Sequence, residues 1–135
     1  MTGSENWIKL TAEPIDVGKV LAFANDPNAG GIAAFVGTTR AESDDANGAL
    51  LALDYEAYDL MALSQMTDLA RRAQERWPVL KLALMHRTGR VAVGEPSVAI
   101  AVATPHRRHA FEACHWLIDT LKAEVAIWKK EVWAQ

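Results

Sequence analysis

The chain has 135 residues, half of them hydrophobic, so we expect one domain, spanning residues 1–135, with a sizeable core. The formal net charge of −3 argues against general nucleic-acid binding, which requires an excess of clustered positive charge. No apolar run approaches the roughly 20 residues that cross a membrane, and the first residues lack the basic and apolar parts of a signal peptide. These features predict a soluble, cytoplasmic protein with no nucleic-acid or membrane partner.

The first part of the chain predicts a tail, a strand, a helix, a second strand and a loop, in that order. We expect a loose tail over residues 1–6, a short strand over 7–11 and then a helix capped by Asp16. The side chains that this helix should bury are Val17, Val20, Leu21 and Ala24. The apolar run 32–36 predicts a buried strand, and the polar run 38–48 predicts a mobile loop.

The middle of the chain mixes strand and helix patterns. Apolar and polar residues alternate over 51–58, which is typical of a half-buried strand, and a long helix is predicted over 60–77. Further strands are predicted over 80–85, 90–93 and 98–103, the last almost wholly apolar. Because some strands follow one another directly and others are joined by helices, the pattern favours an α+β domain with a largely antiparallel sheet.

Basic and imidazole side chains gather in the stretch 104–131. An apolar stripe at helical spacing follows Pro105 and predicts a helix; it consists of Phe111, Cys114, Leu117, Ile118 and Leu121. His106 and Arg107 fall at the start of that helix, where unpaired backbone N–H groups and the helix dipole attract anions. Lys122 lies along the edge of the stripe, where partial desolvation can tune a lysine for chemistry.

Several strings of the sequence, taken in order, resemble the MoaE family, the large catalytic subunits of molybdopterin synthase. The strings are Gly31-Ile-Ala-Ala-Phe-Val-Gly-Thr-Thr-Arg40, Leu53-Asp-Tyr-Glu-Ala-Tyr58, His86-Arg87-Thr88-Gly89 and, within 104–131, His106-Arg-x-x-Ala-Phe-Glu-Ala, Asp119-Thr-Leu-Lys122 and Ile127-Trp-Lys-Lys-Glu131. The resemblance covers the chain from about Trp7 onward. Each string alone is a weak signal, whereas their shared order across one domain is a strong one.

The resemblance implies an α/β-hammerhead arrangement and a sulfurtransferase activity. The implied substrate is cyclic pyranopterin monophosphate, and the implied sulfur donor is a thiocarboxylate on the C-terminal glycine of a small ubiquitin-like partner that ends in Gly-Gly. Two transfers would build the dithiolene of molybdopterin. The resemblance also implies a homodimer within a heterotetramer, and neither a metal nor another cofactor is expected at this step.

The resemblance assigns roles to individual residues. It implies catalytic roles for Lys122 and Lys129, substrate binding by Arg40, His106 and Arg107, and contact of Phe35 with the partner's tail. The residues taken alone leave other interpretations open, namely surface lysines, a solvated loop arginine, a helix end in solvent and a core phenylalanine. Whether Lys122 acts as a general acid or base or stabilises developing charge also stays open.

Other residues receive structural interpretations. Cys114 faces the apolar stripe and is predicted to be a buried thiol rather than a sulfur carrier. His86 and Arg87 are interpreted as structural residues of a turn. Ala126 stands where the family usually has proline, and the chain ends at Gln135, where many relatives continue. Two other functions remain open: a non-catalytic anion-binding or assembly module, and an enzyme acting on another phosphorylated small molecule.

Overall fold

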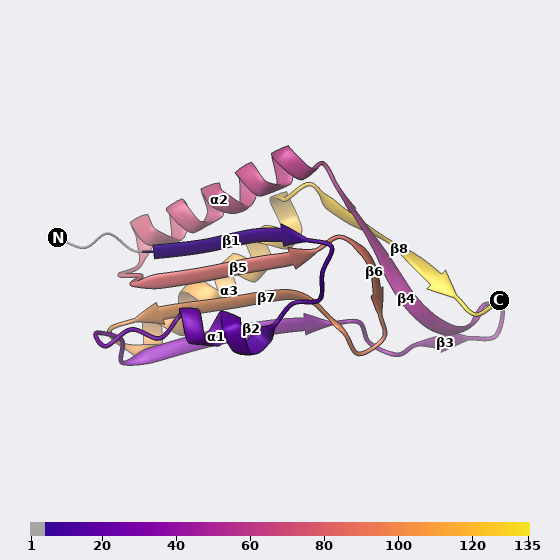
Figure 1. Cartoon of the computed structure of the whole chain (residues 1–135), viewed down its shortest axis with the longest axis horizontal. Helices are drawn as coiled ribbons and strands as arrows, with labels where there is room; N and C mark the ends of the chain where they lie inside the picture. The colour runs from indigo at the N-terminus through magenta and orange to yellow at the C-terminus, as the bar shows by residue number, and fades with distance from the viewer. Residues whose placement is uncertain (1–4) are drawn as a thin grey trace.

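The strands form two sheets (Figure 1) in a computed structural model that describes residues 5–135. The first sheet has the order β1-β5-β7-β2, with bounds Glu5–Thr11 (β1), Lys81–Arg87 (β5), Pro96–Thr104 (β7) and Gly31–Thr38 (β2). β1 pairs with β5 in parallel, whereas β5 with β7 and β7 with β2 pair antiparallel. β2 therefore forms one edge of this sheet.

The second sheet is built on β4 (Gly48–Ala57). β6 (Gly89–Ala92) and β8 (Ile127–Trp133) flank β4, and β3 (Ser43–Asp44) forms a short hairpin with its start; all of these pairs are antiparallel. This sheet projects from one end of the first sheet (Figure 1). One parallel pair among antiparallel ones, with packed helices, confirms the predicted α+β class and its largely antiparallel sheets.

Helices cover both faces of the first sheet. α2 (Asp59–Arg76) and α3 (Arg107–Glu124) lie on one face and α1 (Val17–Phe23) on the other (Figure 1). Side chains alternate along β5, so Leu82 and Leu84 join the core beneath α2 and α3, while Ala83 and Met85 join the core beneath α1. This double cover explains why β5 and β7 read as near-continuous apolar runs. No helix in the described part of the chain is long and apolar enough to cross a membrane.

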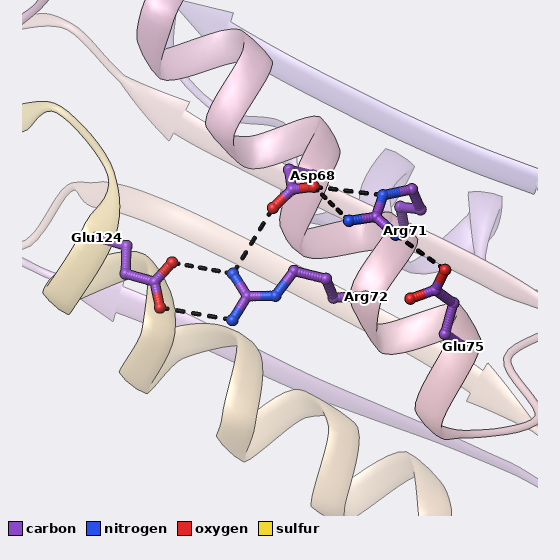
Figure 2. A network of polar contacts seen from close by, with 5 residues as sticks. All are labelled: Asp68, Arg71, Arg72, Glu75 and Glu124. Carbon is purple, nitrogen blue, oxygen red and sulfur yellow. Dashed lines mark hydrogen bonds and ion pairs between the residues drawn. The ribbon is translucent and has the colours of Figure 1, made fainter.

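Charged side chains tie α2 to the C-terminal end of α3, as Figure 2 shows. The guanidinium of Arg72 lies 2.9 Å from Glu124 on α3 and 3.6 Å from Asp68 on its own helix. Arg71 extends the network along α2, pairing with Asp68 at 2.6 Å and with Glu75 at 2.8 Å. The groups are largely exposed, so each pair contributes little to the stability of the fold.

Four sequence-based expectations need correction. Glu5 and Asn6 belong to β1 rather than to a loose tail, because they pair with β5; residues 1–4 lie outside the described part. The cap at Asp16 forms, with Lys19 N–H donating to its carboxylate at 3.1 Å, but Leu21 is 41% exposed because so short a helix buries one side only. The strand at 32–36 forms but is not buried, because β2 lies at an edge and only Ala33 of that run is buried. The predicted loop 38–48 includes the hairpin of β3 with β4.

Candidate active site

A cleft of about 1020 Å³ opens where the C-terminal end of α3 meets the second sheet and the end of β2. Its walls come from elements that are far apart in the sequence, including β2, β4, α3 and β8. Four of the six residues singled out by the sequence line this cleft together: Phe35, Arg40, Lys122 and Lys129. The fold thus brings the predicted catalytic residues and part of the predicted substrate site to one place.

Each of the three cations of the cleft is positioned by a different local structure. The loop that carries Arg40 is anchored at Thr39, whose backbone N–H donates to Glu95 at 3.2 Å and whose carbonyl accepts from Gly94 at 2.8 Å. Lys122 lies in the last turn of α3, as predicted for a lysine stabilised by the helix dipole. Lys129 lies on β8, directly opposite Tyr55 of β4.

The cations of the cleft carry no partner within residues 5–135. Arg40, Lys122 and Lys129 form none of the ion pairs found there, which use other basic side chains. The cleft also contains the carboxylates Glu42 and Glu131, so its charged side chains are three cations and two anions. Unpaired cations in a concave site can bind an anionic ligand without first breaking an existing pair.

His86 lies in the floor of the cleft, and the sequence interpretation of it as a turn residue missed this position. The side chain belongs to the last part of β5, is 5% exposed and packs edge-on against the ring of Tyr55 at 5.0 Å between centroids. Burial lowers the pKa of His86 from its ordinary 6.5, and the positive charge of Lys122 acts in the same direction, against the opposing effect of the Arg87 carbonyl. His86 is therefore neutral at neutral pH.

His106 and Arg107 lie elsewhere. His106 is the N-cap of α3 and Arg107 its first residue, and both are exposed to solvent. From residue 107 to residue 122 the helix rises by about 22 Å, at about 1.5 Å per residue. Within one chain these two residues therefore cannot contact a small ligand held by Lys122.

Cys114 is buried beneath α3, as predicted, and lies outside the cleft. Burial raises the pKa of its thiol to about 11, so very little thiolate exists at neutral pH. This environment is that of a packing residue and does not suit a sulfur carrier.

Three cations that form no ion pair within residues 5–135 line an open, partly apolar cleft, and such a site suits an organic anion. A family model described as "MoaE protein" matches residues 10–124, and the chain belongs to this family. The chain is 43% identical over 131 residues to molybdopterin synthase catalytic subunit 2 of Aedes aegypti, covering 96% of this chain and 83% of that protein. It is 40% identical over 132 residues to the human molybdopterin synthase catalytic subunit, covering 98% of this chain and 69% of that protein.

Solved structures agree with this assignment. The crystal structure of molybdopterin synthase from Staphylococcus aureus matches with a TM-score of 0.86 at 31% sequence identity, covering 93% of this chain and 90% of that chain. The family predicted from the strings of the sequence is therefore confirmed.

Proposed function

We propose that the chain is the catalytic subunit of a molybdopterin synthase. It takes sulfur from the C-terminal thiocarboxylate of a small ubiquitin-like subunit and transfers it to cyclic pyranopterin monophosphate, and two such transfers build the dithiolene. The observation that carries the proposal is the cleft of this MoaE-family chain, which Arg40, Lys122 and Lys129 line while forming none of the ion pairs in the described part of the chain. Both reactants are anionic, so the three cations suit them.

Lys122 is the proposed catalytic group. Its neighbours Ile118 and Leu121 also line the cleft, so its apolar stem would lie along an apolar edge with the amine in the open space. An ammonium there stabilises negative charge that develops on the reacting acyl group or donates a proton to the departing group. Lys129, which lines the cleft from β8, draws the thiocarboxylate into place by its charge.

Two partly exposed aromatic side chains of the cleft are the proposed contacts for the partner's tail. Phe35 is 36% exposed and Trp128 is 43% exposed, and both line the cleft. A Gly-Gly tail has no side chains, so it can pass between two aromatic rings in an extended conformation and bring its terminal group to Lys122. Phe35 thereby acts as the proposed contact for the tail.

We also propose that two copies of the chain complete the site. A Cβ atom on Gly31 would lie 2.9 Å from the Cα of Arg107, so the start of β2 and the start of α3 lie together. β2 is an edge strand with exposed apolar side chains at Ile32 and Phe35. If β2 pairs antiparallel with β2 of a second copy about a two-fold axis, the Gly31 end of one strand meets the Thr38 end of the other.

This pairing accounts for the separation of the predicted substrate residues. Thr38 lines the cleft, so the second copy's His106 and Arg107 would approach the cleft from its open side, near Arg40. His106 and Arg107 would then hold the phosphate of a substrate whose reacting carbons face Lys122 of the first copy. Light scattering at micromolar concentration should give the mass of a dimer, and a monomer alone would contradict this arrangement.

The proposed substrate can be tested by titration calorimetry with the pterin precursor and with simple nucleotides. The precursor should bind, and Arg40→Ala should weaken binding by about 1.5–3 kcal/mol, the value of a charge-assisted hydrogen bond. Arg108→Ala is the matched control, because Arg108 is exposed and does not line the cleft. Tighter binding of nucleotides than of the pterin would instead favour an enzyme acting on another phosphorylated molecule.

A further inference from the structure

Transfer of sulfur from a thiocarboxylate requires a base at one of its steps. The need for this base, and therefore the inference drawn from it, rests on the proposed function. When the thiocarboxylate sulfur bonds to a carbon of the substrate, an oxygen substituent of that carbon leaves with the bonding electron pair, and the small subunit and the substrate become joined through a thioester. The sulfur belongs to the substrate only after the acyl–sulfur bond has broken. Water from the solvent is a sufficient acceptor for the acyl group, but its attack at neutral pH needs a group that takes its proton.

His86 has the geometry of such a base. Its Nδ1 lies 2.7 Å from the carbonyl oxygen of Arg87, and a carbonyl only accepts, so Nδ1 carries the hydrogen and donates it. The neutral ring then has its lone pair on Nε2. Among the residues that the structure describes, no hydrogen bond is made to Nε2. Nε2 is also not among the fully buried side-chain atoms that lack a partner, so it is not fully buried. The ring lines the cleft, so Nε2 is the free acceptor of a fixed tautomer.

The surroundings of His86 keep it in this form. The charged or titratable groups that share the cleft with it are Arg40, Glu42, Tyr55, Lys122, Lys129 and Glu131. Lys122 is close enough for its positive charge to disfavour the imidazolium, and burial acts in the same direction. The carboxylates Glu42 and Glu131 are exposed, whereas His86 is buried. His86 is the imidazole side chain among the residues that line the cleft. A charged donor beside a neutral acceptor is the arrangement expected of an acid–base pair.

We infer that His86 is the general base that activates water to cleave the thioester between the small subunit and the substrate. The water oxygen bonds to the acyl carbon, and the water proton passes to Nε2 of His86. The acyl–sulfur bond breaks, and its electron pair stays on sulfur, so the products are the carboxylic acid of the small subunit and the thiolate of the substrate. The proton then leaves Nε2 for the solvent. Lys122 stabilises the negative charge on the acyl oxygen as water attacks.

The test is single turnover with thiocarboxylated small subunit and cyclic pyranopterin monophosphate, followed by intact-protein mass spectrometry. His86→Asn keeps an N–H that can donate to the Arg87 carbonyl but has no basic nitrogen, so it separates the base from the packing. The thioester adduct should form at the wild-type rate and then accumulate, with cleavage slowed by roughly a hundredfold or more. Hydroxylamine, which needs no base, should release the adduct equally well in both proteins. His115→Asn is the control, since His115 is exposed on α3 and pairs with Asp119.

Several results would overturn the role of His86. Cleavage of the adduct at the wild-type rate in His86→Asn excludes it as the base, and an equal slowing of adduct formation and cleavage indicates a structural role instead. His86→Gln, which retains an acceptor without basicity, should behave like His86→Asn. In the wild-type protein, cleavage should slow as the pH falls through the pKa of His86, which burial lowers from 6.5. His86→Asn should lose this pH dependence, and the same pH profile in both proteins contradicts the inference. If the wild-type protein forms neither adduct nor product, the proposed function itself fails.

Discussion

Replacement of Lys122 by alanine should separate chemistry from stability. Lys122 is exposed in the last turn of α3 and forms none of the ion pairs in the described part of the chain. Its loss removes a favourable interaction with the helix dipole, worth about 0.3–1 kcal/mol, and alanine returns part of this through its higher helix propensity. The free energy of unfolding should fall by less than about 1 kcal/mol, which corresponds to roughly 3–5 °C in Tm for a domain of this size.

The rate of sulfur transfer should respond far more strongly. If the amine of Lys122 stabilises or protonates the reacting group, its removal should slow single-turnover transfer by roughly a hundredfold, or about 2.7 kcal/mol in activation free energy. Lys122→Arg keeps the charge but not the compact amine, so it should restore the rate only in part. Lys130→Ala serves as the control, because Lys130 is on β8 beside Lys129 but does not line the cleft. A near-normal rate in Lys122→Ala, with saturating partner and precursor, would refute this role and move it to Lys129.

Three other predictions follow from the environments of single residues. Arg107→Ala should weaken binding of the pterin precursor by about 1.5–3 kcal/mol, measured by calorimetry, and unchanged affinity would remove Arg107 from the site. Cys114 should react slowly with a thiol reagent at pH 8 in the folded protein, because its pKa is raised to about 11; fast labelling without unfolding would contradict the burial. Between the unfolded pKa of His86, about 6.5, and its lower folded pKa, the unfolded chain binds more protons, so stability should fall on acidification by up to about 1.4 kcal/mol per pH unit. Denaturant titrations from pH 7 to pH 5 should lose this slope in His86→Asn, and an unchanged slope would place the cause elsewhere.

Local patterns in the sequence predicted the elements well because each pattern has a local cause. The strand at 51–58, the cap at Asp16 and the helix through Leu117 all form. The predicted faces are correct only in part, because Leu51 and Phe111 are exposed and Ala52 is buried. Sheet order has no such local signal. The run 32–36 is apolar enough for a central strand, yet β2 lies at the edge of its sheet and leaves Ile32 and Phe35 partly exposed.

The candidate site was predicted from the family's strings and not from spacing alone. The convergence of Arg40 with Lys122 depends on how the end of β2 meets the end of α3, and the periodicity of either segment does not encode that meeting. The period of β5 places His86 on the same face as Leu82 and Leu84, but only the packing shows that the cleft and Lys122 lie there. The separation of Arg107 from Lys122 also follows from the rise of the helix. The proposed approach of Arg107 to the cleft of a second copy depends on how two chains would pack, and helix periodicity does not encode that packing.

Reconstitution of sulfur transfer is the most direct test of whether this chain is a catalytic subunit. The purified protein is mixed with a thiocarboxylated small subunit and cyclic pyranopterin monophosphate, and the dithiolene product is measured together with the small subunit consumed. Wild-type reactions should yield dithiolene, with two small subunits consumed for each pterin, and Lys122→Ala should yield little product. Firm binding of the small subunit without any dithiolene from the wild-type protein would contradict it and identify a non-catalytic assembly module.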